Sequence, residues 1–254
     1  MGLLRRDITP AVISFVCLLL LWQLISLFFQ PTFLPSPEDL AWKVGTVLSG
    51  KRAYLVMGKT LERVLIGLIL SMLLGTAVGI LMGLRRAVEN FLDSWIMVLL
   101  TFPAISWAFL SVLWFGLSEI APIFTIVLIV FPYVTMNVWV GAKAVDKELL
   151  DMAKVFKAKR ALLLRKVVVP QLMPYVFSSL RISFALSWKI ALVSEAFGAG
   201  RGVGKELMYW FQGTRADMML AWGLSFMLLM VFVDVVIFRW WERRTFSWRL
   251  VPVA

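Results

Sequence analysis

Apolar residues are concentrated in six runs of about 20 residues, and the stretches between these runs hold most of the charged residues. The runs lie near positions 11–29, 62–83, 93–115, 120–141, 174–197 and 218–240. A helix of about 20 apolar residues is long enough to cross the hydrocarbon core of a bilayer, which is roughly 30 Å thick. The pattern therefore predicts an all-α, polytopic membrane protein with about six transmembrane helices.

The polar segments divide the chain without indicating a second domain. We predict an N-terminal transmembrane helix within residues 1–33 and an external interfacial segment at 34–59. A transmembrane core follows at 60–241 and encloses a cytoplasmic loop at 142–173, and residues 242–254 form a cytoplasmic tail. Apolar residues at helical spacing in the external segment predict a short interfacial helix; they are Leu40, Val44, Val47 and Leu48. The first apolar run lacks a small-residue cleavage site, which favours a retained helix over a signal peptide.

The basic residues predict how the helices are oriented. If the N-terminus is inside, the inner segments hold 16 Lys and Arg residues and the outer segments hold 8. Cytoplasmic loops of membrane proteins are enriched in Lys and Arg. We therefore expect both termini and the loop at 142–173 on the cytoplasmic side.

Composition narrows the possible classes of function. Of the 254 residues, 61% are hydrophobic, against about 45–50% in soluble domains. The net charge of +11 would suggest nucleic-acid binding in a soluble protein, but here it reflects basic cytoplasmic segments, so we expect no nucleic-acid partner. The chain has no His and one Cys, Cys17, which excludes an intrachain disulfide and a metal site built on imidazole or thiolate. No Ser/His/Asp or paired-carboxylate arrangement indicates an enzyme.

The segment at 147–166 is basic and amphipathic, and we expect it to form a single helix of roughly 18 residues. Leu149, Ala153 and Phe156 follow one another at spacings of four and three residues, which places them on one helical face. Such a face can dock in a groove of a partner protein. The alternative is a surface helix whose charges are solvated.

This segment resembles the coupling loop of ABC-importer permeases, the inner-membrane components of binding-protein-dependent transport systems. That loop follows a pattern close to E-A-A, three residues, G, and later I/V-x-L-P; the matching positions here are Asp151–Ala153, Lys157 and Val167–Pro170. The resemblance implies contact with a separate ATPase through Leu149, Asp151, Ala153, Phe156, Lys157 and Pro170. Because Lys lacks the conformational freedom of Gly, we expect the loop geometry at Lys157 to differ from that of the family.

Further motifs extend the resemblance over about residues 34–240, in the order found in the subgroup that serves sulfonates, taurine and nitrate. They are Leu34–Pro37, Thr60–Leu65, Leu81–Leu84, Trp114–Gly116, Phe131–Pro132, Leu180–Ile182, Glu195, Gly198 and Gly202–Gly204. The resemblance implies a type I ABC-importer permease fold in a bacterial cytoplasmic (inner) membrane. It also implies a permease dimer in lipid, two ATP-binding subunits and an external solute-binding protein. No cofactor is expected in this chain, because ATP and Mg²⁺ are bound by the partner ATPase.

Four residues of the fifth apolar run are candidates for lining the translocation path: Arg181, Trp188, Lys189 and Glu195. A charge at the centre of a bilayer costs about 2.5–3.5 kcal/mol, so it needs a partner or a water-filled path. Arg181 could instead extend to the cytoplasmic edge, and Lys189 could form a structural ion pair with Asp234 or Glu195. The cations and the subgroup favour a small anion as the solute, with a neutral or heterocyclic vitamin precursor as the alternative.

Two glycine patterns also carry expectations. Gly198–Lys205 looks like a phosphate loop, but Ala199 and Glu206 stand where that loop needs Gly and Ser or Thr. We interpret it as a flexible external turn next to the solute-binding protein. Small residues spaced by four in the second run predict close helix packing; they are Gly75, Gly79 and Gly83.

Two other classes of membrane protein are alternatives to a permease subunit. A stand-alone secondary carrier would want paired intramembrane acids and inverted repeats, and a membrane-embedded enzyme of lipid metabolism would need clustered Asp, His or Cys. The sequence shows neither feature. We therefore predict the permease subunit of an ATP-driven importer, which is not itself an enzyme.

Overall fold

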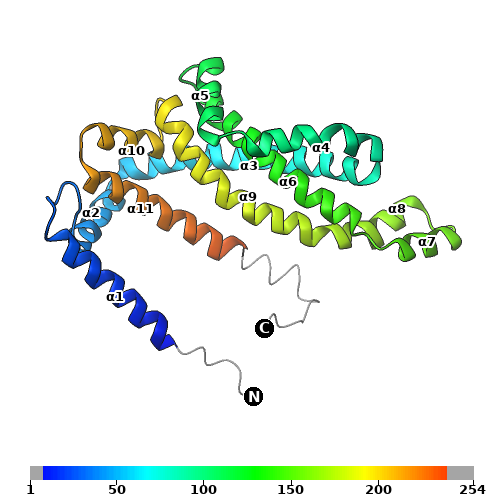
Figure 1. Cartoon of the computed structure of the whole chain (residues 1–254), viewed down its shortest axis with the longest axis horizontal. Coiled ribbons are helices and arrows are strands. Elements are labelled where there is room, and N and C mark those ends of the chain that lie inside the picture. Colours follow the sequence, from blue (N-terminus) through cyan, green and yellow to red (C-terminus); the bar gives the residue numbers. More distant parts are fainter. Residues whose placement is uncertain (1–7, 239–254) are drawn as a thin grey trace.

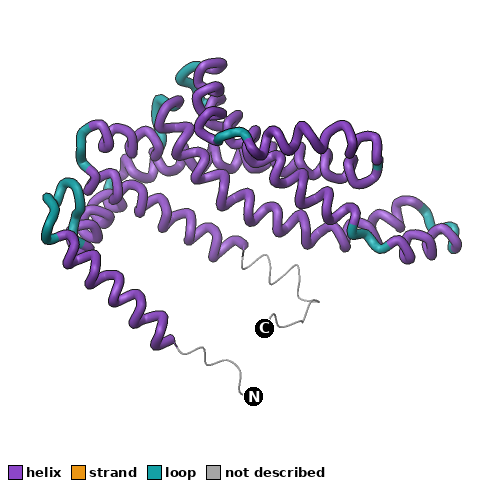
Figure 2. Tube along the Cα trace, in the orientation of Figure 1, coloured by secondary structure: helices purple, strands orange, loops and turns teal. Residues whose placement is uncertain are grey.

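The structure, a computed structural model, describes residues 8–238, and every regular element in this part of the chain is a helix (Figure 1, Figure 2). In chain order these are α1 (Ile8–Ser26), α2 (Pro37–Ser49), α3 (Lys51–Leu84), α4 (Arg86–Thr101), α5 (Ala104–Phe115), α6 (Ile120–Lys143), α7 (Lys147–Val155), α8 (Arg160–Leu163), the π-helical turn η1 (Leu164–Val168), α9 (Val169–Gly198), α10 (Val203–Gln212), α11 (Ala216–Val233) and the π-helical turn η2 (Asp234–Phe238). The predicted all-α class is confirmed. The predicted tail at 242–254 lies outside the described residues.

Among the described residues, 4 helices are long and apolar enough to cross a membrane. They are α3, α6, the continuous helix Ala161–Gly198 and the helix Ala216–Val236. Counting the bent pair of α4 and α5 as one span raises the number to 5, and the apolar part of α1, Val12–Ser26, is shorter. Each of the six predicted runs thus contains a helix or a helix pair, and the predicted number of about six roughly fits.

The third predicted run, 93–115, is not one straight helix. α4 and α5 meet at an angle of 95°, and the residues between them are extended, with ψ of 133° at Phe102 and 129° at Pro103. Pro103 has no backbone N–H to continue α4, and its ring disfavours a helical conformation at Phe102. The expectation of an unbroken span is therefore wrong here, and α5 rises steeply from the layer of long helices (Figure 1).

The core is formed where α3, α6 and α9 pack together, and glycines bring α3 close to α6. A Cβ atom at Gly75, Gly79 or Gly83 would lie 2.6, 2.7 or 2.3 Å from the nearest atom of α6. Real side chains do not pack so closely, so a larger residue at these positions would push the two helices apart. The predicted close packing along this row of glycines is confirmed.

α2 and α10 lie at one end of the long axis, and α7 and α8 lie at the other (Figure 1). Following the orientation predicted from the basic residues, we name these the outer end and the inner end. α2 starts after Ser36, whose hydroxyl oxygen accepts the N–H of Asp39, and it buries Leu40 and Val47. A short helix is therefore present where the sequence predicted one. α1 stands apart from the core in Figure 1 and joins the bundle at the outer end, next to α2.

Candidate functional site

At the inner end, a side-chain cap fixes where α7 begins. Oδ1 of Asp146 accepts the backbone N–H of Glu148 at 2.8 Å, as residues preceding a helix commonly do. The N–H of Asp146 itself donates to Oε1 of Gln171, in the first turn of α9, at 2.9 Å. This hydrogen bond links the start of α7 to a helix that is long enough to cross the membrane.

The backbone turns left-handed two residues after α7 ends at Val155. Lys157 has a φ of +50°, and the N–H of Ala158 donates to the carbonyl of Ala153 at 2.9 Å. This bond over five residues marks a Schellman C-terminus, in which the residue before the donor is usually Gly. For a residue with a Cβ atom, the left-handed conformation costs roughly 1–2 kcal/mol.

Two expectations from the sequence are therefore wrong. Residues 147–166 do not form one helix, because the left-handed residue Lys157 turns the chain between α7 and α8. Lys157 also does not alter the turn in the expected way, since it adopts the conformation that Gly would favour. The chain therefore keeps the sharp turn, at the cost of a strained backbone conformation at Lys157.

α7 and the residue that follows it expose apolar side chains among charged ones. Phe156 is 77% exposed and Leu149 is 37% exposed. Met152 and Asp151 are exposed between them, and Ala153 is half-buried. Apolar side chains exposed together at the tip of a protein are typical of a contact with a partner.

Pro170 does not close a loop, as the sequence predicted, but lies inside a continuous helix. α8, η1 and α9 follow one another without a break, and Ala161–Gly198 forms one helix. Pro170 lacks the N–H that would bond to the carbonyl four residues earlier. The π-helical turn η1 directly before it widens the helix at this point, which accommodates the missing bond.

The charged residues of α9 differ in their partners. Nη2 of Arg181 lies 3.7 Å from Oδ2 of Asp234, and Glu195 pairs with Arg63. Lys189 has no carboxylate partner among the described residues. The structure therefore does not support the alternative in which Lys189 pairs with Asp234 or Glu195, because each of these acids has an arginine partner.

Two cavities flank Lys189. The larger, of about 380 Å³, lies between α9 and α11 and is also lined by Arg181 and Trp188. The smaller, of about 220 Å³, lies between α5, α6 and α9 and has apolar walls. The ring of Trp188 lies 5.6 Å from Nζ of Lys189, within range of a cation–π contact. Three of the four candidate path residues thus share one cavity, whereas Glu195 lines neither.

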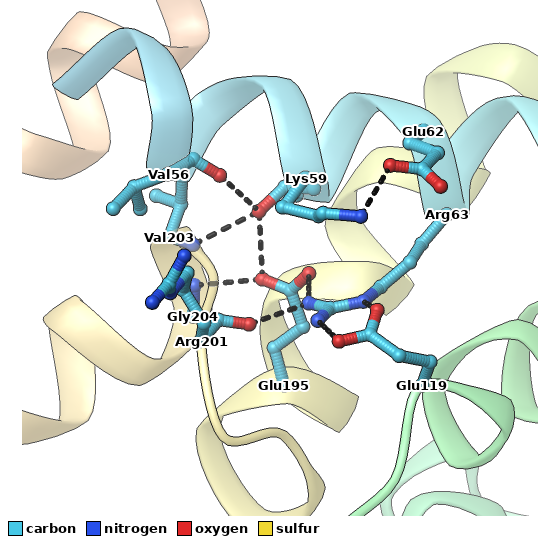
Figure 3. Close-up of polar contacts among 10 residues, drawn as sticks. Val56, Lys59, Glu62, Arg63, Glu119, Glu195, Arg201, Val203 and Gly204 are labelled. Carbon is cyan, nitrogen blue, oxygen red and sulfur yellow. Dashed lines mark hydrogen bonds and ion pairs between the residues drawn. The ribbon is translucent and has the colours of Figure 1, made fainter. Parts of the chain in front are cut away.

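Glu195 lies in a buried polar cluster at the outer end (Figure 3). Its side chain is 0% exposed. Oε2 accepts hydrogen bonds from the hydroxyl of Thr60 at 2.9 Å and from the N–H of Gly204 at 3.0 Å. Oε1 pairs with Arg63. Oγ1 of Thr60 in turn accepts the N–H of Val203 at 2.9 Å. This carboxylate therefore joins α3, α9 and the start of α10.

Arg63 extends the cluster to the connection between α5 and α6. Its Nε and Nη2 donate to the two carboxylate oxygens of Glu119 at 2.7 and 2.8 Å. Its Nη1 donates to Glu195 and to the carbonyl of Arg201, the latter at 2.6 Å. A buried guanidinium is tolerated only with such a set of acceptors, because an unpaired charge in a low dielectric is strongly destabilising. One arginine thus holds three other segments against α3 (Figure 3).

Glu119 differs from Glu195 in its exposure. Its side chain is 61% exposed, and it precedes α6, outside the apolar spans. Hydrogen bonds from Arg63 lower the pKa of the Glu119 carboxyl below its usual 4.5, against an opposing effect of partial burial and with help from the nearby charges of Arg63, Lys59 and Arg201. Glu119 is therefore ionised at neutral pH and keeps its pair with Arg63.

The turn between α9 and α10 is seated on this cluster. Gly202 has a φ of +144°, and a Cβ atom there would lie 2.4 Å from a carboxylate oxygen of Glu195. A Cβ atom at Gly204 would lie 2.1 Å from the carbonyl oxygen of Leu192. Only Gly fits at both positions. The segment that the sequence predicted as a flexible turn is therefore anchored by its own backbone.

Sequence reasoning selected Glu195 but missed Thr60, Arg63 and Glu119. One signal was available, because Arg63 and Glu195 are opposite charges near the outer ends of two predicted spans. The predicted topology places both residues at a similar depth. That relation favours a pair, although it does not exclude Glu62 or Glu119 as the partner of Arg63.

Comparison with known proteins identifies relatives over most of the chain. The model of the family described as "Binding-protein-dependent transport system inner membrane component" matches residues 67–246. The chain is 28% identical over 253 residues to the taurine transport system permease protein TauC of Escherichia coli (strain K12), covering 96% of this chain and 91% of that protein. It is 28% identical over 250 residues to the putative aliphatic sulfonates transport permease protein SsuC of Bacillus subtilis (strain 168), covering 98% and 88%.

A further relative and a solved structure extend this comparison. The nitrate import permease protein NrtB of Leptolyngbya laminosa is 28% identical over 221 residues, covering 79% of this chain and 74% of that protein. The fold is similar to a chain of the MetNI methionine ABC transporter, solved in inward facing conformations, with a TM-score of 0.64 and 16% identity, covering 74% of this chain and 93% of that chain. At this identity the likeness concerns the fold alone.

Proposed function

Since this chain belongs to the family of binding-protein-dependent transport system inner membrane components, we propose that α9 lines the path along which a small anion crosses the membrane. The chain is the membrane-spanning permease subunit of an ABC importer, a class in which a separate chain hydrolyses ATP. It is a multi-pass membrane protein and a transport subunit, not an enzyme.

The position of the Lys189 ammonium group is the observation that supports an anionic solute. It lies on an exposed face of α9, nine residues or about 13 Å before the helix ends at Gly198. A cation at this depth against lipid costs up to about 2.5–3.5 kcal/mol, and the ring of Trp188 offsets only part of this. Because the described residues give Lys189 no carboxylate partner, a passing anion is the counter-charge that its position favours.

The relatives support a solute that carries an anionic group. Taurine and aliphatic sulfonates carry a sulfonate group and nitrate is an anion, and permeases named for these solutes are similar to most of this chain. Arg181 adds a second cation to the larger cavity, partly neutralised by Asp234. A neutral or heterocyclic solute would leave Lys189 without a counter-charge, so the anion is the better proposal.

We further propose how the importer is assembled. A second copy of the chain covers the exposed face of α9, so that the two copies enclose the path. Each copy offers one of the two ATP-binding subunits an apolar surface formed by Leu149, Ala153 and Phe156. These subunits bind ATP and Mg²⁺. The solute-binding protein delivers the anion at the outer end. This arrangement puts both termini in the cytoplasm of a bacterial cell, in agreement with the distribution of basic residues.

Replacing Lys189 tests the anion path. In proteoliposomes that contain the assembled importer, Lys189→Met should assemble at normal yield but take up taurine, an alkanesulfonate or nitrate at least about tenfold more slowly, which corresponds to about 1.4 kcal/mol. Lys189→Arg keeps the charge and should retain more uptake. Lys59→Met removes a cation that pairs with Glu62 at the surface, and it serves as the matched control with normal uptake. Full assembly together with unimpaired uptake in Lys189→Met would contradict the proposal.

A further inference from the structure

The outer end neutralises most of its own positive charge. Eight Lys and Arg residues lie on this side in the predicted topology, and most of them pair with carboxylates. The pairs are Lys43–Asp39, Lys43–Asp217, Arg52–Glu206, Lys59–Glu62, Arg63–Glu119, Arg63–Glu195 and Arg215–Asp217. Within residues 8–238, the basic residues of this side without a carboxylate partner are Lys51, Arg201 and Lys205.

Arg201 belongs to the turn that is seated on Glu195, and Lys205 lies in the first turn of α10, which follows it directly. Both side chains are exposed. The backbone that carries them is fixed at three points: the carbonyl of Arg201, the N–H of Val203 and the N–H of Gly204. These groups bond to Arg63, Thr60 and Glu195, respectively, and Figure 3 shows the turn lying against this cluster. The two charges are therefore presented from a rigid support.

A rigid, unpaired cationic turn is suited to binding an acidic surface. Fixing the backbone in advance reduces the conformational freedom that is lost when two proteins associate. The outer segments of membrane proteins are also poor in Lys and Arg. Of the three cations on this side without an ion pair in residues 8–238, Arg201 and Lys205 lie only four residues apart at this turn, and Arg201 acts on Glu119 only from a distance. A partner outside the chain best explains this pair of charges.

We propose that Arg201 and Lys205 form a docking site for an acidic patch on the solute-binding protein. The proposal rests on the proposed function and on its topology. Direct binding of the small solute is a weaker explanation, because neither residue lines the two cavities beside Lys189. Glu195 is then a positioning residue, because its carboxylate holds the backbone of the turn in place.

The test measures how strongly the solute-binding protein stimulates the importer. The assembled complex is placed in nanodiscs, and ATP hydrolysis is followed against the concentration of its solute-binding protein, purified with the solute bound. The double variant Arg201→Glu/Lys205→Glu should raise the half-maximal concentration of binding protein about tenfold or more, with a similar maximal rate. Added salt should weaken the stimulation of the unaltered importer much more than that of this variant.

Two matched variants separate charge from position. Arg201→Lys/Lys205→Arg keeps both charges and should stay within about threefold of the unaltered importer. Gly202→Val also keeps both charges, but its side chain displaces the turn from Glu195. It should lower the yield of assembled complex, and in the fraction that assembles it should raise the half-maximal concentration, which a role of the two charges without a fixed position would not predict.

The outcomes distinguish this proposal from the proposed function. An unchanged half-maximal concentration in the charge-reversed variant overturns the docking site. An effect that appears only in nanodiscs with anionic lipid overturns it in favour of a lipid contact. If the unaltered complex hydrolyses ATP but transports no solute, the proposed function itself is contradicted, and the docking site with it.

Discussion

Arg63 and Glu195 form a buried ion pair across 132 residues of sequence, and this pair joins α3 to α9 at the outer end. Both side chains are surrounded by further hydrogen-bond partners, so neither charge is left alone (Figure 3). α3 and α9 both belong to the core, and the turn after α9 rests on the same carboxylate. The pair therefore determines how the outer ends of two long helices and the first turn of α10 are placed.

Glu195→Gln should strongly destabilise the assembled complex. The amide of Gln would turn an N–H₂ group toward the N–H of Gly204 or the guanidinium of Arg63, so one donor must face another. Removing one partner of a buried pair typically costs about 3–5 kcal/mol. Thermal unfolding of the purified complex should show a clearly lowered midpoint and a reduced yield.

Glu62→Gln is the control for this substitution. Glu62 makes an exposed pair with Lys59 on the same helix, and such surface pairs contribute about 0–1 kcal/mol. Its unfolding midpoint should stay close to that of the unaltered complex. If Glu195→Gln and Glu62→Gln behave alike, the buried pair does not stabilise the fold in the way described.

Acid should weaken the contact between Glu119 and Arg63. The pKa of Glu119 is lowered in the folded protein, mainly by hydrogen bonds from Arg63. A carboxyl with a lowered pKa stabilises the fold above its usual value of 4.5, and this contribution is lost as the pH falls below that value. The unfolding midpoint should therefore fall more steeply between neutral and acid pH in the unaltered complex than in Glu119→Gln. Parallel pH profiles would exclude a stabilising role for this pair.

The positions of the helices could be predicted from the sequence because they depend on local properties. Apolar runs of membrane length became helices, and the row of Gly75, Gly79 and Gly83 became a close helix contact. The residue pair Phe102 and Pro103 favours a helix break, but the apolar residues on both sides predict one continuous span. The sequence prediction followed the apolar pattern and was wrong at this point. Proline alone does not decide this, since Pro132 lies within the intact helix α6.

The buried cluster could not be derived in the same way. Its members come from α3, from the segment before α6 and from both sides of the turn after α9, so it depends on how these segments meet in space. Sequence alone also assigned Lys157 a geometry that its residue type favours, whereas the hydrogen bond of Ala158 to Ala153 holds it in another. In both cases a tertiary or turn interaction outweighs a local preference.

Gly75→Leu should separate α3 from α6. A Cβ atom at Gly75 would lie 2.6 Å from the Cβ of Val134, so a leucine forces the helices apart along their whole contact. Gly58→Leu is the matched control, because no atom lies within 4 Å of a Cβ there and the substitution is otherwise the same. Assembly should fail or drop severely for Gly75→Leu and stay normal for Gly58→Leu. Equal yields would show that the glycine row does not determine the packing.

Thiol labelling tests the orientation of the chain. In a Cys17→Ser background, a cysteine at Gln212 should react with an impermeant reagent in intact cells, because this exposed residue is the last of α10, at the outer end. A cysteine at Val155, which is exposed on α7, should react only after the cells are opened. The opposite pattern would invert the topology and remove α7 from the reach of an ATPase.

Lys157→Gly should stabilise the turn after α7, whereas Lys157→Val should disrupt it. The left-handed backbone at this position suits Gly and costs roughly 1–2 kcal/mol for a residue with a Cβ atom, and more for a β-branched one. If α7 transmits the movement of the ATPase, a fixed turn is needed for coupling.

Transport per ATP hydrolysed in proteoliposomes should therefore be unchanged or higher in Lys157→Gly and several-fold lower in Lys157→Val, at equal assembly. Lys159→Val, two residues further on and exposed, controls for the loss of a positive charge and should couple normally. Normal coupling in Lys157→Val would mean that the turn can change its shape without consequence, and α7 would then not be the transmitting element.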